Sequence, residues 1–301
     1  MRFGTTIAGV GEPTFVLIHG LGATRRIWDF VVPLLKVEHK VIAFDLRGHG
    51  ESEKPEVGYA LEDLASDVDE LLRRYGVTRP VLVGHSAGAN VAVHHAVTRR
   101  NARGVVLVDG ALVELHAHLS WEDALDGFAP PSDDAYQIEK FVRDGWSEVP
   151  DSDQLMEMRR SLFEWDKGGE VRKRLTPERH LAILRSLWEQ DVHADIAALG
   201  CPVLIVACRP RPGADARWTT QKELAAARLA RLRHVRAEWL DDTIHDVPVQ
   251  RPREVAGAIL SFARTLAPPE RAPSAVVTER RFSRQVQRMS RFARSRPSER
   301  E

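Results

Sequence analysis

Short apolar runs separated by helix-like segments constrain the fold of this chain more than any other feature. The runs end at turn residues and are FVLIH (15–19), VIAFD (41–45), VLVGH (81–85), VVLVD (105–109), VLIVA (203–207) and a weaker VRAEWL (235–240). Their Val, Ile and Leu residues show little alternation, which is typical of strands that are buried on both faces. Helical patterns lie at 61–76 and 253–267. This alternation predicts an α/β fold with a mostly parallel sheet, flanking helices and right-handed crossovers.

The alternation stops after Asp109. Residues 111–200 show no good strand pattern, and they carry helix-like stretches near 136–144, 154–165 and 178–190. The segment also holds four of the seven tryptophans, which are Trp121, Trp146, Trp165 and Trp188. We expect a helical cap, or lid, over the sheet edge at which the strands end, because open α/β sheets bind ligands there. A helical subdomain with the tryptophans as its own core is the alternative.

Composition is that of an ordinary soluble protein. The chain has 301 residues, of which 43% are hydrophobic and 29% charged, and its formal net charge is zero, so the overall balance does not favour nucleic acid or a membrane. The N-terminus lacks the pattern of a signal peptide, and no window approaches about 18 apolar residues. Cys201 and Cys208 would lie near opposite ends of one strand, too far apart for a disulfide. We therefore expect a cytoplasmic protein with reduced thiols.

The sequence GHSAG at 84–88 lies where an apolar run meets a helix-like segment. It fits the G-x-S-x-G pattern of a nucleophile elbow, in which a serine stands on a sharp strand-to-helix turn. Gly84 and Gly88 would let backbone segments crowd around the turn, so that the Ser86 hydroxyl projects outward. To attack, the serine would need a general base and a group that orients that base. The alternative is a tight structural turn that requires small residues.

Attack by Ser86 would create an oxyanion, which needs two hydrogen-bond donors. The N–H of Ala87 follows the serine at the start of a helix, where the helix dipole also favours negative charge. The second donor should come from another strand end, and HGLG at 19–22 lies there. We predict an oxyanion hole formed by the N–H groups of Leu21 and Ala87. A plain glycine turn is the alternative for HGLG.

Four motifs occur in a fixed order along the chain. They are HGLG (19–22), DLRGHGES (45–52), GHSAG (84–88) and TIHDVPVQRPREVAGAILSF (243–262). Together they resemble the α/β-hydrolase fold family over residues 1–267, in particular its serine-nucleophile esterases and lactonases. The resemblance implies the chain order Ser, acid, His, and it indicates His245 as the base. Epoxide hydrolases and dehalogenases of this fold attack with a carboxylate, so Ser86 argues against those branches.

The acid is where this sequence departs from the family pattern. The resemblance implies an aspartate a few residues after the strand at 203–207, but that loop reads CRPRPGAD, and Asp215 comes late. A minority of the family places the acid after the preceding strand, where Asp109 stands. We prefer Asp109, with Asp215 as the alternative acid and a site without a dedicated acid as a third interpretation. Loss of the orienting acid would lower the rate strongly without abolishing it.

Several other polar residues receive no chemical role. His85 in the elbow is expected to be structural. Asp45 and Arg47 resemble a structural motif of the family, which ties a loop to its neighbours by charged hydrogen bonds. His116 and His118 form an H-x-H, but a metal site would need further ligands at matching spacing. We therefore predict no metal and no cofactor.

Residues 268–301 differ in character from the rest of the chain. The segment begins with a proline-rich stretch and continues with arginine-rich sequence. In total it contains nine Arg and four Glu. Within 279–295 apolar residues recur on one face of a predicted helix. A basic amphipathic helix can contact an anionic membrane surface or a protein partner. A mobile tail without a specific role is the alternative, and no nucleic-acid partner is expected.

These patterns predict three segments and one function. The segments are an α/β-hydrolase core at 1–110 and 201–267, the helical cap at 111–200 and the basic tail at 268–301. We expect a serine hydrolase that cleaves an ester, thioester or lactone of a small apolar substrate through an acyl-enzyme on Ser86. Alternatives are a catalytically impaired ligand-binding homologue, acyl transfer or cofactor-free oxygen chemistry in the same pocket, and an interaction module that acts through its tail.

Overall fold

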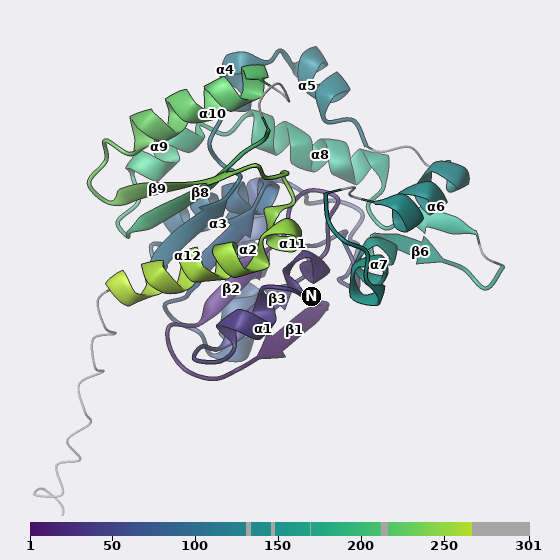
Figure 1. The fold of residues 1–301 in the computed structure, drawn as a ribbon, viewed down its shortest axis with the longest axis horizontal. Coiled ribbons are helices and arrows are strands. Elements are labelled where there is room, and N and C mark those ends of the chain that lie inside the picture. The colour runs from purple at the N-terminus through teal and green to yellow at the C-terminus, as the bar shows by residue number, and fades with distance from the viewer. Residues whose placement is uncertain (131–133, 146–147, 169, 212–215, 267–301) are drawn as a thin grey trace, which may run out of the picture. The chain divides into compact units, whose positions relative to one another are not determined.

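The computed structural model describes residues 1–130, 134–145, 148–168, 170–211 and 216–266. Within these residues seven strands form one sheet in the order β1-β3-β2-β4-β5-β8-β9 (Figure 1). The strands are β1 Thr5–Ala8, β2 Phe15–Ile18, β3 Val41–Phe44, β4 Val81–His85, β5 Gly104–Val108, β8 Val203–Arg209 and β9 Val235–Asp241. Neighbouring strands are parallel, except that β1 pairs with β3 antiparallel. The mostly parallel sheet predicted from the apolar runs is confirmed.

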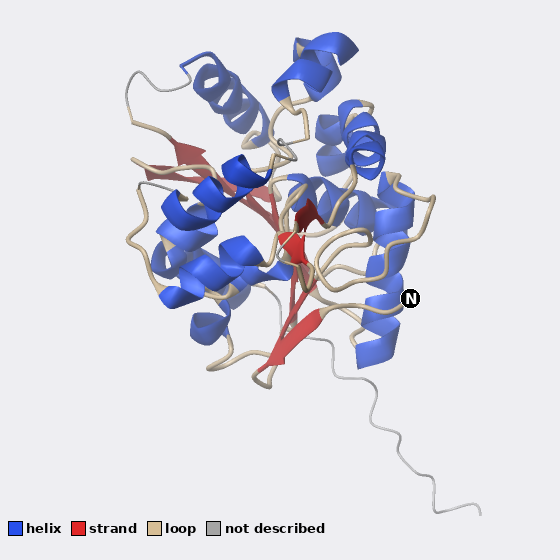
Figure 2. Cartoon of the chain, turned by 90° about the vertical axis from the view of Figure 1, so that its right-hand side faces the viewer, coloured by secondary structure: helices blue, strands red, loops and turns tan. Residues whose placement is uncertain are grey.

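Helices cover both faces of this sheet, which explains why the strand sequences do not alternate (Figure 2). Along β2, Val16 and Ile18 pack into the core on one face, and Phe15 and Leu17 pack into the core on the other. All four side chains are fully buried, so the strand is apolar at every position. The first core includes residues of α2 (Leu61–Tyr75), α3 (Ala87–Arg99), α9 (Val192–Ala197) and α10 (Ala216–Leu229). The second includes residues of the 3-10 helix η1 (Arg25–Trp28), α1 (Val32–Leu35), α11 (Val247–Gln250) and α12 (Pro252–Thr265).

The helices expected at 61–76 and 253–267 form as α2 and α12. Gly76 ends α2 in the left-handed region, with φ 64°, a conformation that glycine adopts at little cost. The strand β1 was not anticipated, because its four residues, TTIA, are partly exposed and too few to show a period.

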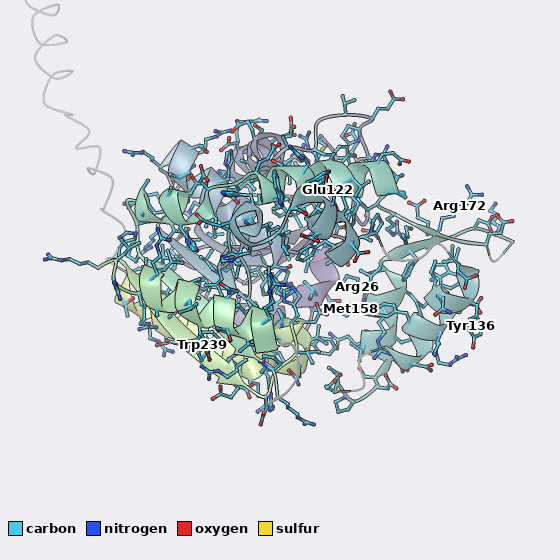
Figure 3. All side chains as sticks on the ribbon, turned by 90° about the horizontal axis from the view of Figure 1, so that it is seen from above. Arg26, Glu122, Tyr136, Met158, Arg172 and Trp239 are labelled. Carbon is cyan, nitrogen blue, oxygen red and sulfur yellow. The ribbon has the colours of Figure 1, made fainter. Side chains whose placement is uncertain are left out.

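Residues 111–200 form helices and one hairpin. The helices are α4 (Leu115–His118), α5 (Trp121–Gly127), α6 (Ala135–Asp144), α7 (Asp153–Arg160), α8 (Pro177–Trp188) and α9. The expectation that this segment holds no strand is wrong, since β6 (Phe163–Trp165) pairs antiparallel with β7 (Val171–Lys173). Strands of three residues are too short to reveal their period in the sequence. Figure 3 shows Tyr136 of α6 and Arg172 of β7 on the side of the molecule away from Trp239 of β9.

Met1–Leu266 forms one compact unit. The division of this unit into a core and a cap stays a prediction. The basic tail predicted at 268–301 lies outside the described residues. Among the residues that are described, no helix is both long enough and apolar enough to cross a membrane.

Candidate active site

Ser86 lies on a sharp turn between β4 and α3. Its backbone has φ 54° and ψ −126°, a conformation that is costly for residues other than glycine. A Cβ on Gly84 would lie 2.2 Å from the carbonyl oxygen of Gly88, and one on Gly110 would lie 2.1 Å from that of Ser86. Backbone packing that only glycine permits therefore holds the serine in its strained conformation.

Gly88→Ala should destabilise the fold strongly. A Cβ there would lie 2.3 Å from the carbonyl oxygen of Ile18 and 2.5 Å from that of His19, and a close-packed core does not yield easily. We expect a loss of about 2–3 kcal/mol in the free energy of unfolding, measured by urea denaturation. Gly257→Ala is the matched control, because nothing lies within 4 Å of its Cβ position in α12. It should gain about 0.5–1 kcal/mol, and equal effects of the two substitutions would contradict the packing argument.

Three side chains that are far apart in the sequence meet at this turn. The Ser86 hydroxyl donates to Nε2 of His245 over 2.9 Å. The Nδ1–H of His245 donates to Oδ2 of Asp109 over 2.7 Å. Asp109 directly follows β5, which neighbours β4, and His245 follows β9 before α11. The parallel sheet brings these residues to one edge, and their contacts have the form of a nucleophile, a base and an orienting acid in series.

Of the two predicted acids, Asp109 contacts His245, whereas Asp215 lies outside the described residues. The Asp109 side chain is fully buried. Its Oδ1 accepts from the backbone N–H of Cys208 over 2.9 Å, and Nζ of Lys222 lies 2.8 Å from each carboxylate oxygen. Burial opposes ionisation, but the hydrogen bond and charge of His245, together with Lys222, outweigh it and lower the pKa of Asp109 to about 2. No sequence motif indicated Lys222, because residues within a helix carry no fixed spacing to the elbow.

His245 is held at its ring and at its backbone. Its side chain is 52% exposed and lines the cavity beside Ser86. Desolvation disfavours the imidazolium, but the hydrogen bond and charge of Asp109 outweigh it and raise the pKa of His245. The Nε2–H of His85 donates to the carbonyl oxygen of His245 over 2.9 Å. Burial and the neighbouring His245 lower the pKa of His85, so this elbow histidine acts as a neutral donor that positions the His245 loop.

The predicted oxyanion donors Leu21 and Ala87 line the same cavity as the serine. Ala87 is the first residue of α3. The loop that carries Leu21 is held by His49, whose Nε2 accepts from the N–H of Gly22 over 3.1 Å. The Nδ1–H of His49 donates to the carbonyl oxygen of Arg47 over 2.9 Å. Burial lowers the pKa of His49 to about 3, which keeps the acceptor neutral, so the DLRGHGES motif positions the HGLG loop.

The three side chains line a cavity of about 140 Å³, to which residues of the 111–200 segment also contribute. Its apolar lining includes Leu112, Val113, Phe128, Leu184, Leu187 and Trp218. Phe128 contacts Trp218 of α10, with 6.3 Å between ring centroids. Trp121 and Trp188 pack instead against each other at 5.9 Å, and Trp146 lies outside the described residues. Among the described residues, the tryptophan that lines this cavity is Trp218 of α10.

The remaining predicted residues have structural contacts. Asp45 accepts from the backbone N–H groups of Arg25 and Glu51 over 2.7 and 2.9 Å. Arg47 forms an ion pair of 2.6 Å with Asp67. The His116 Nδ1–H donates over 3.1 Å to the carbonyl oxygen of residue 188. Across the part of the chain that the structure describes, no group of three or more His, Cys, Asp or Glu side chains could hold a metal ion.

Comparison with known proteins places this geometry in a family. The model of the "Alpha/beta hydrolase family" matches residues 15–258. The chain belongs to the alpha/beta hydrolase family. A crystal structure of E-2-(acetamidomethylene)succinate hydrolase is similar to this alpha/beta hydrolase, with a TM-score of 0.69 at 25% identity, over 87% of this chain and 95% of that one. The family resemblance and the fold class predicted from the motifs are thus confirmed.

Curated relatives match this alpha/beta hydrolase over shorter regions. A 2-(acetamidomethylene)succinate hydrolase of Mesorhizobium japonicum is 29% identical over 140 residues, which are 46% of this chain and 50% of that protein. A soluble epoxide hydrolase of Corynebacterium sp. is 40% identical over 94 residues, 31% of this chain and 32% of that protein. The matched region thus spans about a third to a half of these relatives. The enol-lactonase of Burkholderia xenovorans shares the fold, with a TM-score of 0.61 at 19% identity, over 87% of this chain and 96% of that one.

Proposed function

We propose that this alpha/beta hydrolase cleaves an ester, thioester or lactone of a small apolar acid through an acyl-enzyme on Ser86. The observation that carries the proposal is the chain of hydrogen bonds from Ser86 through His245 to the buried Asp109, at 2.9 and 2.7 Å. A serine hydroxyl becomes a useful nucleophile when a base lies within hydrogen-bond reach and a third group orients that base. The geometry meets both conditions and supports attack by serine rather than by a carboxylate.

In the first half of the reaction His245 Nε2 takes the hydroxyl proton while Ser86 Oγ bonds to the carbonyl carbon. The N–H groups of Leu21 and Ala87 stabilise the oxyanion that results. The bond to the leaving alcohol or thiol then breaks, and the leaving group takes the proton from His245. Asp109 stays ionised and stabilises the imidazolium during each transfer.

In the second half a water molecule attacks the acyl carbon. His245 removes the proton from that water and then returns it to Ser86 Oγ as the ester bond of the acyl-enzyme breaks. The acid leaves, and the starting protonation states are restored. All proton transfers of this cycle pass through one ring nitrogen, Nε2, because Nδ1 is bonded to Asp109.

The cavity beside Ser86 supports a small apolar acyl group. Its volume of about 140 Å³ is below the ~300–1,000 Å³ of sites that enclose drug-sized ligands. The side chains of Leu112, Leu184 and Leu187 line it and offer no hydrogen bonds. An acyl group of a few carbon atoms would fill the space and leave the carbonyl carbon at the serine.

A series of p-nitrophenyl esters tests the proposal. Rapid mixing with the acetyl or butyryl ester should give a burst of p-nitrophenolate close to one per enzyme molecule, because the acyl-enzyme forms faster than water releases it. The kcat/KM for the butyryl ester should exceed that for the dodecanoyl ester by about tenfold or more. No turnover of any ester, thioester or lactone would contradict the hydrolase proposal. Equal turnover of esters with short and long acyl groups would contradict the proposal that the substrate carries a small acid.

Two further proposals rest on the sequence and concern the protein outside its candidate active site. We propose that the basic segment 279–295 contacts an anionic membrane surface or a protein partner, since its apolar positions share one helical face. We also propose that the protein works in the cytoplasm. The basic segment lies outside the described residues.

A further inference from the structure

Lys222 lies beside the candidate acid and has no part in the steps above. It belongs to α10, and its ammonium lies 2.8 Å from both Oδ1 and Oδ2 of Asp109. Its side chain is 13% exposed and that of Asp109 is fully buried. Lys222 also lines the cavity together with Ser86 and His245. Charges in such poorly solvated surroundings act strongly on one another.

The contacts around Asp109 fix the direction of its carboxylate. An aspartate χ2 torsion is otherwise broad. Lys222 holds both oxygens, and the Cys208 N–H holds Oδ1. Oδ2 is thereby directed at Nδ1 of His245. The ion pair from α10 thus keeps the acid in the orientation that His245 needs.

The same ammonium opposes protonation of His245. A neutral His245 lies beside a carboxylate whose charge Lys222 balances, whereas an imidazolium adds a second positive charge to this pair. Asp109 accordingly raises the pKa of His245 and Lys222 lowers it, with Asp109 the stronger of the two.

We propose that Lys222 is a positioning residue that aligns Asp109 with His245 and sets the pH range over which His245 acts as a base. The catalytic part of this inference rests on the proposed function. The effect on the protonation of His245 does not, because it follows from the charges alone.

Other titratable groups also face His245. His85, at the end of β4, lies 4.9 Å away between ring centroids and donates to the backbone of His245. Asp246, the next residue along the chain, raises the pKa of His245. The charged side chains that line the adjoining cavity are Glu148, Arg211, Lys222 and Asp242, besides Asp109. Lys222 is the lysine that contacts Asp109 directly, so it is the charge to remove.

Lys222→Met should raise the pKa of His245 by about one unit, because the field of Asp109 is then no longer offset. His245 would bind its proton at higher pH, so the acidic limb of the kcat/KM profile should move upward by the same amount. On that limb, at a given pH, kcat/KM should fall about tenfold. Lys222→Arg keeps the charge and should leave the limb at its wild-type position.

NMR titration of ¹⁵N-labelled histidines measures the pKa of His245 without any need for turnover. Wild type, Lys222→Met and Lys222→Arg are compared with Arg228→Met, which removes the same charge from an exposed position of α10. Lys222→Met alone should shift the pKa upward. An unchanged or lowered pKa in Lys222→Met, or an equal shift in Arg228→Met, would overturn the inference. If the shift occurs but no ester is turned over, the proposed function fails while the charge effect stands.

Asp109→Asn covers the case in which Lys222→Met does not fold. In this variant burial and the ammonium that has lost its partner both lower the pKa of His245, so it should fall below its ordinary value of about 6.5. Adding Lys222→Met to Asp109→Asn should return the pKa toward that value. A His245 pKa that stays the same or falls when Lys222→Met is added to Asp109→Asn would overturn the inference.

Discussion

Ser86→Ala should abolish labelling by a fluorophosphonate probe and lower ester hydrolysis by about 10⁶-fold. The probe bonds to an activated serine oxygen with loss of fluoride, a step that needs the His245 base, which lies 2.9 Å from that oxygen. Alanine keeps the Cβ and removes only the hydroxyl, so the fold should persist and the loss should be one of chemistry. In-gel fluorescence and mass spectrometry of the labelled peptide are the measurements.

Ser66→Ala is the matched control for this experiment. Ser66 is an exposed serine of α2, and its loss should leave labelling and hydrolysis unchanged. If wild type is not labelled, or if labelling survives Ser86→Ala, the serine hydrolase proposal fails. The protein would then be better described as a catalytically impaired homologue that binds a ligand in this cavity.

Asp109→Asn should lower kcat for a model ester by about 10⁴-fold. An asparagine amide cannot hold Nδ1–H of His245 and Lys222 as the carboxylate does, so the imidazole loses both its tautomer and its electrostatic support. The comparison is Asp215→Asn, which should stay close to the wild-type rate, because Asp109 already occupies Nδ1 at 2.7 Å. If Asp215→Asn proved the more damaging of the two, the acid would have to be reassigned. Parallel thermal unfolding of both variants separates a loss of chemistry from a loss of structure.

Much of the fold could be predicted because its signals are local and strong. The strands β2, β3, β4, β5 and β8 are apolar at nearly every position, since helices cover both sheet faces. The elbow could be predicted for a similar reason. The close approaches of backbone around Gly84 and Gly88 admit no side chain. This requirement produces the G-x-S-x-G pattern around Ser86.

Other features left no such pattern. The hairpin of β6 and β7 has strands of three residues, which are too short to show a period. Lys222 was missed because a single lysine in a helix has no motif, although it forms an ion pair with Asp109. His85 was expected to be structural, but its bond to the backbone of His245 spans 160 positions of the chain and could not be inferred from spacing.

The sequence by itself determined the mostly parallel sheet, the sharp turn at Ser86 and the family of the chain. Burial on two faces and packing that only glycine permits each restrict the residue type at individual positions, so both leave a local sequence pattern. Only the tertiary structure decided which described side chains meet at that turn. The sheet order places Asp109, at the end of β5, beside β8 and close to the loop that follows β9, so Asp109 lies within 2.7 Å of His245. A contact of this kind depends on how strands are ordered in space, and chain order alone does not contain that information.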